Sequence, residues 1–265
     1  MNTLALIREV YPVGFPMMSA VLGAITGSFL GVVAERVPPM VMEEEGCGNL
    51  LFPGSHCPVC QHSLSAWENI PLLSWLVLRG RCRQCRTAIP LQVFLIELFT
   101  AIFFGITAWC VPGIETLFSL WLLAAFLLPL AMIDWKHQLL PDCLTQPLLW
   151  AGLLIHALGS ALSLRDALFG AVAGYLSLWL LYWGFRLTTG REGLGYGDFK
   201  LLAALGAWCG WQALPSIELI AALCGIMGYL ASGNLNKNNQ TISFGPYLSL
   251  AGIVVFIMQA FAVTF

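Results

Sequence analysis

Residues 117–133 read LFSLWLLAAFLLPLAMI and carry no charged side chain. A helix needs about 20 mostly apolar residues to cross the hydrocarbon core of a bilayer, and this run supplies most of them. The stretch therefore predicts a membrane-spanning helix. It is followed directly by an acid, Asp134.

The composition extends this interpretation to the whole chain. Of its 265 residues, 58% are hydrophobic and 10% are charged, whereas a soluble domain carries about 25% charged residues. The bilayer must be the main solvent, so we expect an all-α, polytopic membrane protein with about eight transmembrane helices. The first run is too long for a signal-peptide core and is taken as retained. The candidate spans are residues 13–34, 91–112, 116–134, 144–163, 167–187, 199–213, 216–233 and 242–264.

The distribution of Lys and Arg predicts the orientation, because cytoplasmic loops carry an excess of both. With eight spans, the side of the N-terminus holds two basic residues and the opposite side holds ten. The opposite side is therefore predicted to be cytoplasmic, with both termini periplasmic. Asp134 ends the third span and Asp198 begins the sixth, so both acids are expected at the cytoplasmic face. The ten residues are Arg36, Arg79, Arg81, Arg83, Arg86, Lys136, Arg186, Arg191, Lys200 and Lys237.

The same orientation places residues 35–90 in the cytoplasm. This loop lies between the first helix (1–34) and a seven-helix membrane domain (91–265). This loop contains Cys57-Pro-Val-Cys60 and Cys82-Arg-Gln-Cys85, with 21 residues between the two motifs. Two such motifs suit a closed, tetrahedral zinc site with four thiolate ligands, which is structural rather than catalytic. The alternatives are a pair of disulfides or a degenerate site without metal, and a reducing compartment favours metal over disulfides. Membrane anchoring accounts for the nearby arginines, so no nucleic acid is expected.

Few acids lie in or against the spans, and an ionisable group at that depth is a functional candidate. The candidates are Glu97, Asp134, Asp142, Asp166, Asp198 and Glu218. Glu97 and Glu218 could be polar contacts between spans, whereas Asp142 and Asp166 look like helix starts. Asp134 could be an interfacial acid at a helix end. Asp198 lies in a GYGD motif, whose glycines permit close approaches.

Two carboxylates held close together resist ionising at the same time, so such a pair shares one proton. One oxygen can then activate water while the other group protonates a scissile carbonyl. This is the chemistry of aspartic peptidases, and it requires no metal. The residues alone do not decide whether Asp134 or Asp142 would partner Asp198.

Several blocks in one order resemble the type IV prepilin peptidases, the bifunctional leader peptidases and N-methyltransferases of type IV pilus and type II secretion systems. The resemblance covers nearly the whole chain, from about residue 23 to residue 247. The blocks are GSFLGVVAERVP (27–38), CPVC (57–60), WENIPLLSWLVLRGRC (67–82), ID (133–134) with LPD (140–142), GYGDFK (195–200) and SFGPYL (243–248).

The resemblance implies that Asp134 and Asp198 are the catalytic pair, and it favours Asp134 over Asp142. It also implies a bacterial inner-membrane enzyme that cleaves the short basic leader of prepilins or pseudopilins after a glycine. The new N-terminal residue is then methylated with S-adenosylmethionine. Acids of the cytoplasmic loop, Glu43 to Glu45 and Glu68, could meet the charges of the leader.

The residues that bind S-adenosylmethionine are not assigned by the sequence, which has no G-x-G-x-x-G fingerprint. We expect that site in the cytoplasmic loop. One position departs from the family: Gly31 stands where the family commonly has Asn, and this bears more on methyl transfer than on cleavage. No oligomeric state and no particular pilin are predicted.

Three other functions remain open. A presenilin-like intramembrane aspartic peptidase also uses a GxGD aspartate, but the zinc loop argues against it. A proton-coupled transporter could use the two aspartates, but such folds often have paired halves, and none is visible here. An inactive structural member of a secretion machine is the third.

Overall fold

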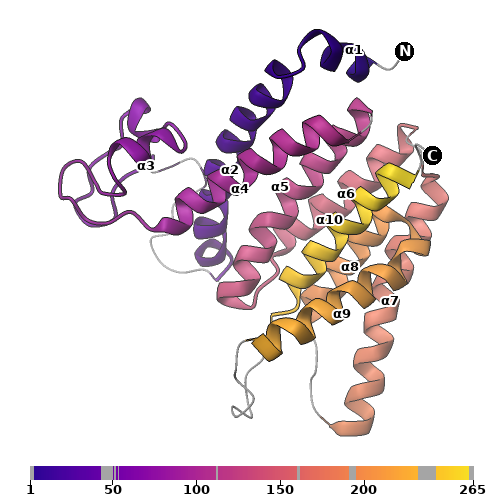
Figure 1. The fold of residues 1–265 in the computed structure, drawn as a ribbon. Helices are drawn as coiled ribbons and strands as arrows, with labels where there is room; N and C mark the ends of the chain where they lie inside the picture. Colours follow the sequence, from indigo (N-terminus) through magenta and orange to yellow (C-terminus); the bar gives the residue numbers. More distant parts are fainter. Residues whose placement is uncertain are drawn as a thin grey trace. The chain divides into compact units, whose positions relative to one another are not determined.

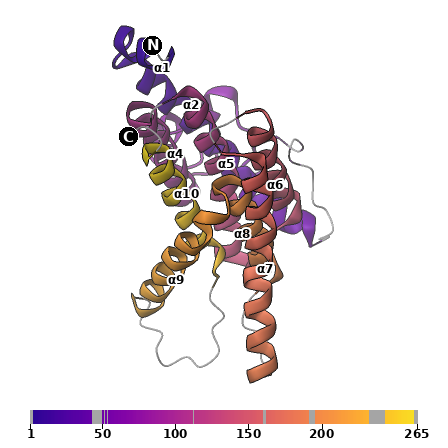
Figure 2. The ribbon, with the colours of Figure 1, turned by 90° about the vertical axis from the view of Figure 1, so that its right-hand side faces the viewer.

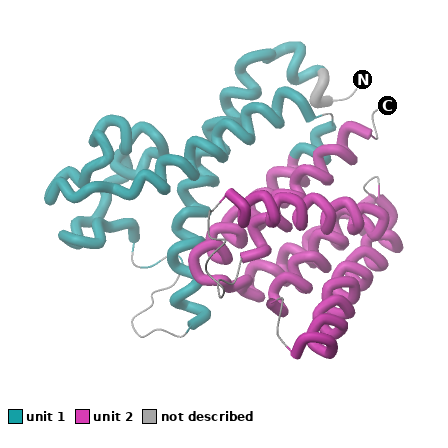
Figure 3. The backbone as a smooth tube through the Cα atoms, turned by 60° about the horizontal axis from the view of Figure 1, so that its bottom comes forward, with its two compact units in different colours: residues 1–117 teal, residues 118–265 magenta. Residues whose placement is uncertain are grey.

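The computed structural model describes residues 3–42, 50, 52, 54–111, 113–159, 162–190, 195–231 and 243–262. Within these ranges the chain is helical, with two isolated β-bridges and no strand, so the all-α fold class is confirmed (Figure 1). The chain divides into two compact units, residues 1–117 and 118–265 (Figure 3). The predicted division into residues 1–34, 35–90 and 91–265 remains a prediction.

Six helices of the described residues are long and apolar enough to cross a membrane, so the multi-pass prediction is confirmed. Two further helices, α6 and α8, have 16 and 14 residues and correspond to the remaining predicted spans. The eight helices are α2 (Gly14–Val41), α4 (Leu91–Cys110), α5 (Ile114–His137), α6 (Asp142–Ala157), α7 (Leu164–Thr189), α8 (Tyr196–Cys209), α9 (Leu214–Ala231) and α10 (Gly245–Ala262). The short helices are α1 (Thr3–Val10), η1 (Ala66–Asn69), α3 (Leu73–Val77) and η2 (Trp211–Ala213).

The first unit is built on the pair α2 and α4, which pack along their lengths. Two glycines of α2 lie against α4, where a side chain would not fit. A Cβ at Gly23 would lie 2.8 Å from the Cβ of Phe104, and one at Gly27 would collide with the hydroxyl of Thr100. Gly31, one turn further along, has no atom within 4 Å of such a Cβ. Glycine is therefore required for packing at the first two positions only.

The helix α2 continues to Val41, past the predicted end of the span at residue 34. It includes Pro38 and Pro39, and its last carbonyls are partly satisfied because the N–H of Met42 donates to the oxygen of Pro38. The prediction ended the span where charged residues begin. Charge marks the edge of an apolar run, but it does not terminate a helix.

The second unit surrounds α8, whose residues from Phe199 to Cys209 are buried apart from Lys200. The helices α6, α7 and α10 pack against it (Figure 2). At the crossing with α7, a Cβ at Gly170 would collide with the backbone of Gly206, and one at Gly174 would lie 2.6 Å from the oxygen of Leu202. Because neighbouring helices cover α8, its length need not match the bilayer.

Side chains from two neighbouring helices satisfy the carbonyls at the end of α8. The Nε2 atom of His156 lies 3.1 Å from the oxygen of Trp208, and Gln259 donates to the oxygen of Cys209 over 2.9 Å. The indole of Trp208 donates to the oxygen of Leu148. A helix end buried among apolar groups needs such partners. They fix α8, and with it the residues at its other end.

Candidate aspartate site and zinc site

Asp134 lies in the last turn of α5 and is 5% exposed. Its Oδ2 atom accepts a hydrogen bond of 3.0 Å from the backbone N–H of Gly245, the first residue of α10. The hydroxyl of Ser243 donates to the backbone oxygen of Asp134 over 2.9 Å. A carboxylate is favourable at a helix N-terminus because the first N–H groups there lack partners within the helix.

Asp198 lies in the first turn of α8 and is 7% exposed. Its backbone N–H donates to the oxygen of Gly195, the residue before the helix, over 3.2 Å. The neighbouring Gly197 contacts the loop that follows α5, because a Cβ there would lie only 2.7 Å from the Cβ of Leu140. The GYGD glycines thus bring the start of α8 against the loop after Asp134.

Both carboxylates are buried, and the glycines beside them pack against the same residue. A Cβ at Gly197 would lie 2.7 Å from Leu140, and one at Gly245 would lie 3.2 Å from it. Two buried acids held in this way are the groups that general acid–base chemistry on a peptide bond uses. The catalytic roles of the two residues remain a prediction.

Asp142 has a different environment from that pair. It is the first residue of α6, its side chain is 61% exposed, and both its oxygens accept hydrogen bonds from the Nζ atom of Lys200, at 2.7 and 2.8 Å. Asp142 is thus exposed and ion-paired, whereas Asp134 and Asp198 are buried.

The other membrane-level acids have local partners. Asp166 caps the start of α7 with Ser163, and its carboxylate accepts a hydrogen bond from Trp211. Glu218 accepts a hydrogen bond of 2.7 Å from Ser177, which joins α9 to α7. Asp166 was predicted to be a helix start and Glu218 a contact between spans. Their surroundings agree with both predictions.

Sequence reasoning assigned no role to Gly245 or Leu140, although both lie in the quoted blocks. A Cβ at Gly245 would lie 2.8 Å from Asp134 Oδ2 and 3.2 Å from a methyl group of Leu140. Only a glycine permits this approach between α10 and the end of α5. A glycine directly before a proline and an apolar run was the available signal.

The four cysteines of the predicted zinc site, Cys57, Cys60, Cys82 and Cys85, come together in the structure, with all ligand atoms within 4.8 Å of one another. The Sγ atoms of Cys57 and Cys85 are 3.7 Å apart, and those of Cys60 and Cys82 are 3.9 Å apart. Four sulfurs bound at about 2.3 Å to a tetrahedral zinc lie about 3.8 Å apart. The residues therefore fit a zinc ion.

The two cysteine motifs have the same backbone arrangement. The N–H of Cys57 donates to the oxygen of His62, and the N–H of Cys82 donates to the oxygen of Thr87. Gln61 and Arg86, which each follow the second cysteine of a motif, have φ angles of 57° and 60°. Matching bridges, His56 to Ser63 and Arg81 to Ala88, close both turns. Each turn holds its two sulfurs on one side.

Hydrogen bonds to the sulfurs favour thiolates at two of the four cysteines. Thr87 lowers the pKa of Cys85 to about 6, and backbone N–H groups of the first motif lower the pKa of Cys57. The N–H of His62 lowers the pKa of Cys60, but burial and the neighbouring thiols raise it to about 11. Four adjacent sulfurs resist full ionisation until a cation compensates their charge, which is how zinc binding couples to proton release.

Glu68 was predicted to meet a basic leader, but the structure gives this residue a local role. It is 5% exposed and accepts hydrogen bonds from the backbone N–H and the hydroxyl of Ser65, which lower its pKa. Arg83 lies over the ring of Trp67 and 3.9 Å from Glu68. The remaining acids of that prediction, residues 43–45, lie outside the described residues.

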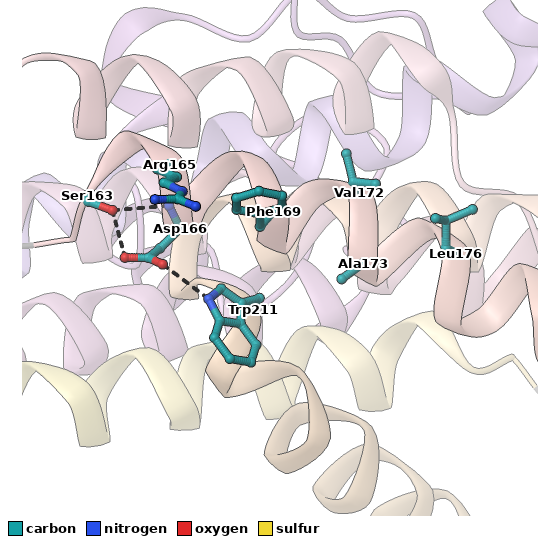
Figure 4. Close-up of a pocket in the computed structure, with 8 residues that line it drawn as sticks. All are labelled: Ser163, Arg165, Asp166, Phe169, Val172, Ala173, Leu176 and Trp211. Carbon is teal, nitrogen blue, oxygen red and sulfur yellow. Dashed lines mark hydrogen bonds between the residues drawn. The ribbon is translucent and has the colours of Figure 1, made fainter.

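A groove of about 690 Å³ lies along the first half of α7 (Figure 4). Arg165, Asp166 and Trp211 are at one end of it, and apolar side chains of α7, including Phe169 and Leu176, continue along it. The charged end and the apolar wall match a boundary between membrane and water. The groove does not include either aspartate.

Two consecutive segments of the chain match known protein families. Residues 21–111 match the bacterial Peptidase A24 N-terminal domain, and residues 121–230 match the type IV leader peptidase family. The first segment contains the four cysteines and the second contains both aspartates. No solved structure matches the chain.

Curated relatives are similar over most of their length. The chain is 50% identical to the prepilin leader peptidase/N-methyltransferase of Aeromonas hydrophila, over 85% of this chain and 84% of the relative. It is 46% identical to that of Stutzerimonas stutzeri over 92% and 90%, and 45% identical to that of Pectobacterium carotovorum over 98% and 99%. These matches do not favour a presenilin-like peptidase or a transporter.

Proposed function

The chain belongs to the type IV leader peptidase family, and from that membership we propose a membrane aspartic endopeptidase that removes the leader of type IV prepilins or type II secretion pseudopilins. We propose further that it methylates the new N-terminal residue. The observation that carries the peptidase proposal is the pair of buried carboxylates, Asp134 and Asp198, whose neighbouring glycines Gly245 and Gly197 both pack against Leu140. The names of the relatives support both activities.

In this proposal the two aspartates share one proton. The ionised carboxylate takes a proton from water, whose oxygen attacks the scissile carbonyl carbon, while the protonated group donates to the carbonyl oxygen. As the tetrahedral intermediate collapses, the group that took the proton from water gives it to the nitrogen of the scissile bond, and a hydroxyl of the intermediate returns a proton to the other group. The leader leaves with a C-terminal carboxyl group, and the mature N-terminus is an amine. The N–H of Gly245 holds one oxygen of Asp134, which keeps its carboxylate oriented during these transfers.

The site lies at the ends of two helices, which suits a membrane-bound substrate. Asp134 is three residues from the end of α5, and Asp198 is in the first turn of α8. The apolar helix of the substrate would lie in the bilayer, and its leader would project from the membrane. The excess of Lys and Arg on this side supports a cytoplasmic location in the inner membrane, with periplasmic termini.

Zinc and S-adenosylmethionine are the proposed cofactors. Zinc would be held by Cys57, Cys60, Cys82 and Cys85, whose four thiolates leave no open coordination position, so its role is structural. S-adenosylmethionine would supply the methyl group, and the cytoplasmic loop remains the proposed location of its site. No atom lies within 4 Å of a Cβ at Gly31, so the packing of α2 on α4 does not depend on whether glycine or the family's Asn stands there.

The peptidase proposal is tested by Asp134→Asn and Asp198→Asn in a leader-processing assay on the purified protein with a prepilin. Each variant should lose cleavage while still inserting in the membrane, because the amide cannot exchange a proton. Asp142→Asn is the matched control and should retain cleavage, since Asp142 is exposed and paired with Lys200. Cleavage by either of the first two variants would contradict the assignment. Labelled S-adenosylmethionine in the same assay reads methyl transfer separately.

A further inference from the structure

The loop that carries the cysteines has an exposed apolar segment beside its zinc site. In α3 the side chains of Leu73, Leu76 and Val77 are 58%, 55% and 69% exposed. Trp67 and Ile70, just before α3, are each 44% exposed. So many large apolar side chains in a short segment indicate a surface that is covered in use.

Contacts within the first unit fix the position of this segment along α4. Trp75 of α3 stacks on Phe94 in the first turn of α4, with ring centroids 4.6 Å apart. The N–H of Leu72 donates to the Oε2 atom of Glu97 over 2.7 Å, and Glu97 is 5% exposed. At about 1.5 Å per residue, Glu97 lies about 9 Å into α4. Therefore α3 lies beside the first two turns of a membrane-spanning helix.

The backbone at the start of α3 is held in a strained conformation. Leu72 has a φ angle of 62°, and the N–H of Leu73 donates to the oxygen of Pro71 over 2.6 Å. A non-glycine residue in such a turn costs free energy and persists where its surroundings hold it. The hydrogen bond to Glu97 and the stacking of Trp75 provide that hold. The orientation of α3 against α4 is therefore held by specific contacts.

The arginines that follow α3 favour an anionic partner for this segment. Arg79, Arg81, Arg83 and Arg86 follow α3 and are exposed. Within residues 54–90 the only acid is Glu68, which is buried against Ser65. The surface of residues 54–90 is therefore basic, which complements anionic phospholipid headgroups.

We propose that the segment from Trp67 to Val77 is an interfacial anchor. It lays the zinc-binding loop on the membrane surface, with the apolar side chains at the headgroup and acyl-chain boundary and the arginines on anionic headgroups. The partner is the phospholipid leaflet into which α4 inserts. The proposal depends on the multi-pass nature of the chain and on neither catalytic activity, so a failure of the peptidase assignment would leave it unaffected.

The test uses the full-length protein in bilayers of zwitterionic lipid, with or without anionic phosphatidylglycerol. A photo-crosslinking residue, p-benzoyl-phenylalanine, replaces Leu76 or, as the control, Val59, which is 63% exposed in the first cysteine motif. We expect several-fold more lipid adducts, measured by mass spectrometry, from position 76. Equal yields at the two positions, or adducts at position 76 to a second copy of the chain, would overturn the proposal.

The charge contribution is tested in the same bilayers with Arg79→Gln, Arg81→Gln and Arg86→Gln combined. Anionic lipid should increase the adducts at position 76 in the parent protein, and the triple variant should lose that increase. Bound zinc, measured in parallel, should be unchanged, which shows that the cysteine motifs remain folded. An undiminished lipid response in the triple variant would contradict the headgroup contact.

Discussion

The backbone N–H of Gly245 donates a hydrogen bond of 3.0 Å to the Oδ2 atom of Asp134, and a Cβ at Gly245 would lie 2.8 Å from that oxygen. The first residue of α10 and the last turn of α5 can approach in this way because glycine has no side chain. The contact engages one oxygen of a buried carboxylate. The position of Asp134 therefore depends on a glycine more than a hundred residues away.

Gly245→Ala should reduce leader cleavage by roughly ten- to hundredfold, because small displacements of a reacting group are costly. The added methyl group must push Asp134 or Leu140 away. Cleavage rates in detergent measure the effect. Gly225→Ala is the control, since its Cβ would make only an ordinary contact of 3.7 Å with Tyr247. Unchanged cleavage in Gly245→Ala would show that the site tolerates the displacement.

Gly31→Asn should leave folding and leader cleavage unchanged, because no atom lies within 4 Å of a Cβ at this position. We expect methyl transfer to be equal to or faster than that of the parent protein. Gly27→Asn is the contrasting variant and should impair folding, since its side chain would meet Thr100 on α4. Both activities are measured in one assay. A loss of cleavage in Gly31→Asn would refute the prediction.

Cys60→Ser or Cys82→Ser should abolish zinc binding and make residues 54–90 sensitive to limited proteolysis. The reason is that a structural zinc site contributes its binding free energy to folding. Atomic absorption of the purified protein should find one zinc per chain in the parent. Cys224→Ser should retain the metal, because Cys224 lies in α9 and is not one of the four clustered cysteines. Full zinc content in either of the first two variants would argue against a four-thiolate site.

Gly206→Ala should destabilise the second unit by about 1–3 kcal/mol, the usual effect of overpacking. The backbones of Gly206 and Gly170 are in contact at the crossing of α8 and α7, so the methyl group must separate the helices. Thermal unfolding in detergent measures the loss. Gly184→Ala, whose Cβ would have no neighbour within 4 Å, should have little effect. Equal melting temperatures would show that the crossing is looser than the geometry indicates.

The helices were largely predictable, and the length of the sixth span shows why the prediction was incomplete. The run at residues 199–213 was the shortest predicted, and α8 has 14 residues. It needs no more because α6, α7 and α10 enclose it. Hydropathy describes each segment against lipid, so it gives no account of a helix that is covered by protein.

Glu68 of the loop also shows that a residue's surroundings in the fold cannot be read from its own segment. Glu68 was expected to meet a basic leader because it carries charge. In the structure it is buried, and its carboxylate accepts a hydrogen bond from the hydroxyl of Ser65. For the cysteines, in contrast, the spacing of Cys57, Cys60, Cys82 and Cys85 was sufficient, and they meet within 4.8 Å. Each motif is a local turn that already holds two of the ligands. The four ligands therefore come together when the two turns meet.

The all-α membrane fold and the grouping of the four cysteines were predictable from the chain, because hydrophobicity and short-range spacing are local properties. The residues left Asp134 and Asp142 open as partners of Asp198, and the family resemblance chose Asp134, whose catalytic role remains a prediction. The folded chain was needed to see which oxygen of Asp134 meets Gly245 and that Lys200 holds Asp142 at the surface. These contacts join segments far apart in the chain, and their existence depends on how closely helices pack, which no single segment specifies.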